Sequence, residues 1–287
     1  MLIVNAYLVG NANSWVLIDS GMPGNAGKIK EAAESRFGPG SKPRAILLTH
    51  GHIDHAGSAP DLAQEWDVRV YSHRLEWPYL NGSSSYPPHD PTAPGFFSFM
   101  VRFMPSRTVD VGERLAELAS NLPALGLDDW QVHFTPGHTA GHVAIYRKSD
   151  GVLLAGDALA TVNMDNFFDL LTKREQVCRP PAPATTDWQQ ARRSVQLLAG
   201  LRPNVIAAGH GAPMQGAADQ LQRLADHFPI PSHGRYVNEP ACTDETGITY
   251  LPPPPFDPVP KIATGVAAAT VLAGAGAFVL KKRVGRS

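Results

Sequence analysis

Two patterns of hydrophobic and polar positions occur along the chain, one typical of strands and the other typical of helices. Apolar runs of strand length, closed by glycine or by a polar turn, lie at residues 2–10, 14–21, 43–50, 67–73, 130–138, 142–157 and 204–211. Stretches with helical spacing lie at 25–38, 58–66, 187–200 and 216–228. Strands first in succession, and then strands that alternate with helices, predict a layered α/β fold in which helices cover the sheets.

Residues 78–108 match neither pattern. The stretch is rich in Pro, Gly and Ser at its start and in Phe and Met at its end. Long loops inside a compact domain are often functional, so this insertion is interpreted as a lid over a site. A packed surface excursion, whose aromatic side chains fill a small core of their own, is an equal alternative.

The C-terminal part of the chain has a different composition. A Pro-rich linker is predicted over 236–260, and its last ten residues read LPPPPFDPVP. The following 262–280 carry no charge and are followed at once by Lys281, Lys282 and Arg283. Length and flanking charges predict a transmembrane anchor over 261–281 and a basic tail over 282–287. A buried Ala-rich helix or an unstructured tail is the alternative, because the apolar character is weak.

Charge and cysteine content narrow the functional classes. The 287 residues include 18% charged residues with a net charge of −1, which argues against a basic face for nucleic acid. The two cysteines, Cys178 and Cys242, lie far apart in sequence and are expected to be reduced thiols. We therefore expect a folded domain over 1–235 in the cytoplasm, anchored to a membrane by the C-terminal tail.

A dense group of metal-binding side chains lies in His50-Gly51-His52-Ile53-Asp54-His55. Alternate side chains of an extended segment point the same way, so His50 and His52 can converge on one ion. Asp54 and His55 lie where the chain turns toward the next helix and can face a second ion. Imidazole and carboxylate are ligands that zinc prefers. A solvated group of surface histidines is the alternative for this cluster taken alone.

Three further candidate ligands each follow an apolar strand and lie in a glycine-containing turn. They are His138 in TPGHTAGHV, Asp157 in GVLLAGDAL and His210 in IAAGHGAP. Sites in layered α/β folds assemble at such strand ends. The set of five histidines and two aspartates is the inventory of a closely spaced metal pair.

The motifs THxHxDH, PGHTxGH, GD and GH together resemble the metallo-β-lactamase fold superfamily, in particular its glyoxalase-II-like and lactonase-like hydrolases. The resemblance covers roughly residues 1–235 and implies an αββα four-layer sandwich with the metals at one edge of the facing sheets. It assigns the first metal to His50, His52 and His138, and the second to Asp54, His55 and His210. It also implies that Asp157 bridges both metals, that Asp19 orients a ligand, and that His142 serves the fold.

This resemblance implies a hydrolase with two Zn²⁺ per chain, although iron or manganese would also suit the ligands. A hydroxide that bridges the metals would attack an ester, thioester or lactone, and Asp54 would accept its proton. Relatives that hydrolyse β-lactams usually carry Cys at the position of Asp157, which argues against antibiotic hydrolysis. The substrate is expected to be a small molecule, and the phenylalanines at 96, 97, 99 and 103 suggest a lipophilic one.

Three alternatives remain at this level. Relatives that resemble persulfide dioxygenases use much the same ligands around a single iron, which would make the protein an oxidoreductase. A phosphodiesterase is a weaker alternative, because nucleic-acid-processing members generally carry a further domain or a basic exosite. A membrane-tethered scaffold with a vestigial site is disfavoured, because all seven ligand positions are intact.

Overall fold

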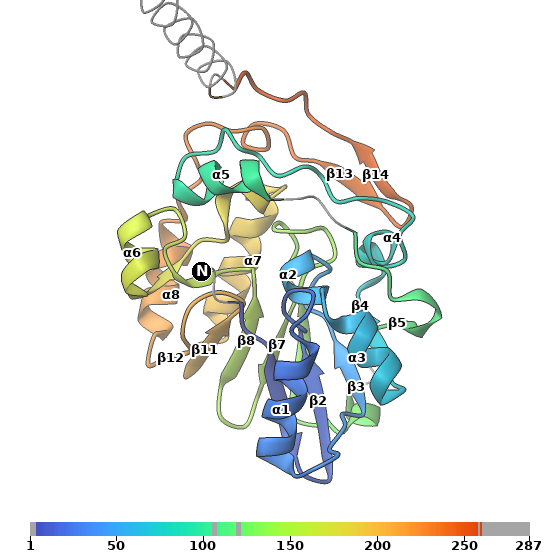
Figure 1. Ribbon diagram of the computed structural model, residues 1–287. Coiled ribbons are helices and arrows are strands. Elements are labelled where there is room, and N and C mark those ends of the chain that lie inside the picture. The colour runs from blue at the N-terminus through green and yellow to red at the C-terminus, as the bar shows by residue number, and fades with distance from the viewer. Residues whose placement is uncertain (1–3, 105–107, 119–121, 258, 260–287) are drawn as a thin grey trace, which may run out of the picture. The chain divides into compact units, whose positions relative to one another are not determined.

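The computed structural model describes residues 4–104, 108–118, 122–257 and 259. The chain divides into two compact units, Met1–Pro253 and Pro254–Ser287. The first unit holds both large sheets (Figure 1), and all of the candidate ligands fall within its bounds.

The first sheet contains five strands in sequence order. They are β1 (Tyr7–Asn11), β2 (Ser14–Ile18), β3 (Ala45–Leu47), β4 (Arg69–Ser72) and β5 (Leu115–Glu117). β1 pairs antiparallel with β2, and the other pairs are parallel. Along β2, Trp15 and Leu17 pack in the cluster beside helices α1 (Ala26–Phe37) and α3 (Ala59–Trp66), whereas Val16 and Ile18 pack in a separate cluster. Because both faces are buried, the strand is an almost continuous apolar run.

The second sheet has the strand order β12-β11-β8-β7-β6. Its strands are β6 (Trp130–Phe134), β7 (Val143–Arg147), β8 (Val152–Gly156), β11 (Val205–Ala208) and β12 (Met214–Gln215). Only β8 and β11 pair in parallel, and the other neighbours are antiparallel. Helices α7 (Trp188–Gly200) and α8 (Ala218–Asp226) cover its outer face, where Leu153 and Ile206 join their cluster.

The two sheets face each other across a shared core. Val16, Leu47, Ile145 and Leu154 belong to one buried cluster that draws on both sheets. With α1 and α3 on one side and α7 and α8 on the other, the layers follow the order αββα (Figure 1). The predicted four-layer sandwich is therefore confirmed.

Shorter elements complete the first unit. They are α2 (Ile53–Ala56), η1 (Arg74–Glu76), α4 (Trp77–Leu80), α5 (Phe96–Met100), η2 (Val101–Phe103), η3 (Gly112–Arg114), η4 (Pro123–Leu125), β9 (Ala160–Val162), α6 (Phe167–Thr172), β10 (Glu175–Cys178), η5 (Ala182–Ala184), β13 (Cys242–Asp244) and β14 (Gly247–Tyr250). The strand pairs β9–β10 and β13–β14 form two small antiparallel sheets.

The insertion at 78–108 is irregular, as its sequence predicts, but parts of it are packed. Phe97 and Val101 are buried in a small cluster with Val162, while Phe99 and Phe103 are 46% and 69% exposed. The buried Asp90 accepts a hydrogen bond from the backbone N–H of Arg235. The aromatic side chains are thus divided between a small core and the surface, and the lid function stays a prediction.

The compact unit extends beyond the boundary at residue 235 that the sequence suggests. Tyr236 is buried, and its hydroxyl donates a hydrogen bond of 2.6 Å to the carbonyl of Pro88. The hairpin of β13 and β14 then occupies part of the predicted linker, and the unit ends at Pro253.

The prediction of a membrane-spanning anchor is corrected by the structure. In the described part of the chain, no helix combines the length and the apolar character needed to cross a bilayer. The predicted span at 261–281, with its basic tail at 282–287, lies outside the described residues. The anchor rested on the length and the flanking charges of a weakly apolar, Ala-rich stretch, and it is withdrawn.

Candidate metal centre

The candidate ligands lie where strands end or turn. His50 follows β3 and His52 is the residue before α2, the short helix that carries Asp54 and His55. Asp157 directly follows β8, and His210 follows β11, so the parallel pairing of these two strands brings both residues to one sheet edge. His138 lies in the loop between β6 and β7.

His138 is held in place by the start of a helix. The carbonyl of Gly137 accepts hydrogen bonds from the backbone N–H groups of Thr186 and Asp187, just before α7 begins. A Cβ atom on Gly137 would lie 2.2 Å from the backbone nitrogen of Ala191, so only glycine permits this approach.

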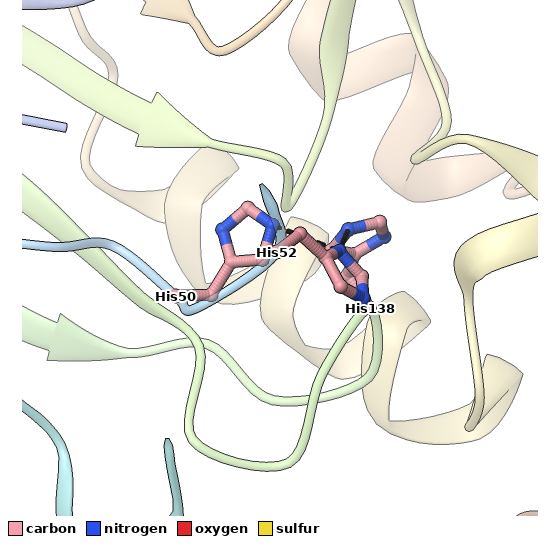
Figure 2. Close-up of side chains that lie close together, drawn as sticks. All are labelled: His50, His52 and His138. Atoms are coloured by element: carbon pink, nitrogen blue, oxygen red, sulfur yellow. Dashed lines mark hydrogen bonds between the residues drawn. The ribbon is translucent and has the colours of Figure 1, made fainter. Parts of the chain in front are cut away.

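Three histidines form the first ligand group. Nε2 of His50 lies 3.0 Å from Nδ1 of His52, which in turn lies 3.0 Å from Nε2 of His138 (Figure 2). These atoms all lie within 4.8 Å of one another. Three converging imidazole nitrogens are the arrangement found at metal sites with histidine ligands.

Asp54, His55 and His210 form the second ligand group, with the same limit of 4.8 Å between ligand atoms. Oδ2 of Asp54 lies 3.4 Å from Nε2 of His210 and 3.9 Å from Nε2 of His55. His55 and His210 are buried, whereas the side chain of Asp54 is 27% exposed. Asp54 is therefore the member of this group that faces solvent.

Asp157 lies between the two groups. Its Oδ2 is 3.5 Å from Nε2 of His138 and 3.2 Å from Nε2 of His210, and its Oδ1 is 3.4 Å from Nε2 of His55. One carboxylate thus contacts histidines of both groups. The structure brings all seven side chains predicted from the sequence into one cluster.

The cluster fits a cation in two further respects. Among the described residues, the buried Nε2 of His55 and the buried Oδ1 of Asp157 find no hydrogen-bond partner, and they lie 3.4 Å from each other. Unpartnered polar atoms are rare in buried positions. A Cβ atom on Gly209 would lie 2.1 Å from Oδ1 of Asp157, so a glycine keeps this space free of protein. Imidazole and carboxylate donors together suit zinc or iron.

The first ligand group is kept neutral by its surroundings. Burial lowers the pKa of His50 and of His138 well below the ordinary value. Burial, assisted by the nearby His89, lowers the pKa of His52 to about 3. Neutral imidazoles have a free lone pair, which is the form that binds a metal.

The second ligand group has the opposite electrostatics. Burial alone would lower the pKa of His210, but Asp157 and Asp54 raise it to about 10. The same two carboxylates, together with Asp19, raise the pKa of His55 well above its ordinary value despite burial. In the metal-free protein, positive charge therefore accumulates on the imidazoles that face these carboxylates. A bound cation would neutralise the negative charge of the same carboxylates.

Residues behind the ligands fix their orientation. The Nδ1 atom of His55 lies 2.9 Å from Oδ2 of Asp19, and the backbone N–H of Thr49 donates to Oδ1 of Asp19. The expected contact between Asp19 and a ligand is thus present. Nε2 of His142 accepts a 2.9 Å hydrogen bond from the backbone N–H of Asp157, so His142 serves the site as well as the fold.

Three residues near the site escaped the sequence reasoning. Glu76 is buried between the two loops that carry the first ligand group, and the ring of Tyr86 lies 4.4 Å from the ring of His52. The ring of His89 lies 5.7 Å from the ring of His52. Each is an isolated residue in a stretch without a motif, so no spacing pattern could have found it.

Comparison with known proteins agrees with this geometry. The sequence model of the metallo-beta-lactamase superfamily matches residues 1–210. The probable metallo-hydrolase YflN of Bacillus subtilis (strain 168) is 39% identical over 218 residues, which are 75% of this chain and 83% of that protein. A hydroxyacylglutathione hydrolase of Methylobacillus flagellatus is 32% identical over 147 residues, or 51% of this chain and 45% of that enzyme.

Solved structures show the same fold. The crystal structure of TTHA1623 in a di-iron-bound form superimposes with a TM-score of 0.52 at 26% identity, covering 78% of this chain and 93% of that one. The chain belongs to the metallo-β-lactamase superfamily. It is a metallo-hydrolase of that superfamily, with groups of histidine and aspartate side chains that can bind metal.

Proposed function

We propose that this protein uses two metal ions to hydrolyse a thioester, ester or lactone of a small molecule. The observation that carries the proposal is the pair of ligand groups with Asp157 between them. The related hydroxyacylglutathione hydrolases support a thioester or ester substrate, and the di-iron form of TTHA1623 supports a two-metal site.

The residues divide the work between holding the metals and handling a proton. Two divalent cations bound here would lower the pKa of a water molecule and polarise the carbonyl of the substrate. His50, His52 and His138 would hold one cation, and Asp54, His55 and His210 the other. Asp157 would contact both.

Asp54 is the proposed proton acceptor. Burial would raise the pKa of its carboxyl, but His55 and His210 hold that pKa below the ordinary value, so the group is ionised at neutral pH. Its side chain is 27% exposed, compared with 3% for Asp157. Asp54 can therefore exchange a proton with solvent after each turnover.

An acyl substrate is supported by the apolar surface around α5 and α6. Phe99, Phe103 and Phe168 are 46%, 69% and 71% exposed, and the rings of Phe96 and Phe167 lie 5.0 Å apart. Behind this surface, Phe97 of α5 packs in one buried cluster with Val162 of β9, and the neighbouring Thr161 donates a hydrogen bond from its hydroxyl to the carbonyl of His210.

The proposal is tested by metal analysis combined with a substrate panel. The purified protein is assayed on acyl thioesters, aryl esters and lactones with short and long acyl chains, and on phosphodiesters. We expect two metal ions per chain and hydrolysis of at least one carbonyl substrate, with Asp54→Asn losing about 100-fold or more in kcat. One iron per chain with oxygen consumption, or activity confined to phosphodiesters, would contradict the proposal.

A further inference from the structure

Glu76 is a fully buried carboxylate outside the seven candidate ligands. It is the last residue of η1 and lies between two loops. One loop carries His50 and His52, and the other carries His138. Burying a carboxylate costs folding free energy unless its oxygens accept hydrogen bonds.

The two carboxylate oxygens of Glu76 hold different loops. Oε1 accepts hydrogen bonds from the hydroxyl of Thr139 at 2.7 Å and from the backbone N–H of Gly141 at 2.8 Å. Oε2 accepts a bond from the backbone N–H of Gly51 at 3.0 Å and another from the hydroxyl of Tyr86. Gly51 lies between His50 and His52, and Thr139 follows His138. One side chain thus joins both parts of the first ligand group.

The loops approach Glu76 as closely as glycine allows. A Cβ atom on Gly141 would lie 2.7 Å from Oε1 of Glu76, and a Cβ atom on Gly51 would lie 2.6 Å from the Tyr86 hydroxyl. Four donors also match the acceptor capacity of an ionised carboxylate. Each donor would lose its partner if the oxygen that it contacts became an amide nitrogen.

We propose that Glu76 is a positioning residue that sets the distance between the loop of His50 and His52 and the loop of His138. Glu76 thereby fixes the geometry of the first metal site. Tyr86, from the insertion at 78–108, completes the arrangement by donating to Glu76 while its ring packs beside His52. The inference rests on the proposed two-metal function.

The effect of Glu76 should be confined to the first metal site. The second group has other supports: Asp19 contacts His55, and the backbone N–H of Asn5 donates to the carbonyl of Gly209, beside His210. Loss of Glu76 should therefore separate the two sites in affinity. A general loss of stability would weaken both sites together.

The test compares Glu76→Gln with Asp90→Asn in the full-length protein, using Co²⁺ as the probe. Asp90 is a matched control, because it is also buried and accepts hydrogen bonds from the backbone N–H groups of Thr92 and Arg235. We expect Glu76→Gln to weaken Co²⁺ binding at one of two sites by about 10–100-fold and to change the visible absorption of that cobalt ion. Asp90→Asn should change neither.

Thr139→Val provides a second variant that keeps the carboxylate and removes only one donor to Oε1. It should shift the same affinity and the same absorption band in the same direction, by a smaller amount. Unchanged spectra and affinities in both Glu76→Gln and Thr139→Val would overturn the inference. If the unaltered protein bound no Co²⁺, the proposed function itself would fail, and the two failures are therefore distinguishable.

Discussion

The charge state of each histidine in the site depends on whether nearby carboxylates outweigh the effect of burial on its pKa. His50, His52 and His138 are buried among imidazoles, and burial keeps their pKa values low. His55 and His210 face Asp54 and Asp157, and their pKa values are raised. The two ligand groups should therefore differ in how metal binding depends on pH.

We predict that metal binding at the second group releases protons. At pH 7 the rings of His55 and His210 are in the doubly protonated, cationic form in the metal-free protein, because their pKa values are raised, to about 10 for His210. Each ring must lose one proton before it can bind a cation. About two protons should be released for this ion and none from the imidazoles of the first group.

The sign follows from the raised pKa values. As the pH rises through the raised pKa values, about 10 for His210, these protons are lost from the metal-free protein, so affinity at the second group should rise with pH and then level off. Calorimetric titration with Zn²⁺ in buffers of different ionisation enthalpy measures the protons released. An affinity that does not change between neutral and alkaline pH would contradict this assignment.

All seven candidate ligands could be named from the sequence, because their motifs are local. HGHIDH places four of them within six positions, and the others follow apolar strands in glycine-containing turns. Glu76, Tyr86 and His89 could not be found in this way. Their importance comes from contacts with residues distant in sequence, such as the 65 positions that separate Glu76 from Gly141.

At the level of elements, the turn after β11 controls the space beside the second ligand group. A Cβ atom on Gly209 would lie 2.1 Å from Oδ1 of Asp157 and 2.5 Å from Cε1 of His55. Gly209→Ala should therefore displace these ligands and remove one metal ion per chain. We expect activity to fall by about 100-fold or more, since ligand geometry governs two-metal chemistry.

Gly200→Ala is the matched control for this prediction. Gly200 ends helix α7, and a Cβ atom there would meet nothing within 4 Å. Metal content by mass spectrometry and hydrolysis rates should be normal in Gly200→Ala and reduced in Gly209→Ala, while far-ultraviolet circular dichroism stays the same in both. Full metal content in Gly209→Ala would show that the turn adapts without cost to the site.

The strands and helices of the sandwich were predictable because each element buries a regular set of apolar positions. The run at 14–18 is apolar on both faces because helices cover one face and the second sheet covers the other. The hairpin of β13 and β14 was missed because it is short and partly exposed, so its residues follow no strict alternation.

At the scale of the whole molecule, the metals would connect segments that span residues 50 to 210 and both sheets of the sandwich. We predict that a chelator lowers the melting temperature of the purified protein. A ligand that binds only the folded state at 100 times its Kd contributes about 2.7 kcal/mol to the free energy of unfolding. Differential scanning calorimetry with and without the chelator measures the change, and re-addition of Zn²⁺ should reverse it. Equal melting temperatures would mean that the folded state gains no stability from metal.

A layered α/β fold with helices outside the sheets followed from the pattern of strands and helices, whereas the order αββα came from the resemblance to the superfamily. The extent of the compact unit did not follow, because it depends on the contacts that Asp90 and Pro88 in the insertion make with Arg235 and Tyr236. The Pro-rich composition there indicated a linker, whereas tertiary contacts extend the unit to Pro253.

The most direct measurement of the central claim is a crystal structure of the zinc-loaded protein with anomalous scattering recorded at the zinc edge. Two peaks about 3.5–4 Å apart are expected, one bound by His50, His52 and His138 and the other by Asp54, His55 and His210. Asp157 should contact both. A single peak, or peaks away from these side chains, would contradict the two-metal account.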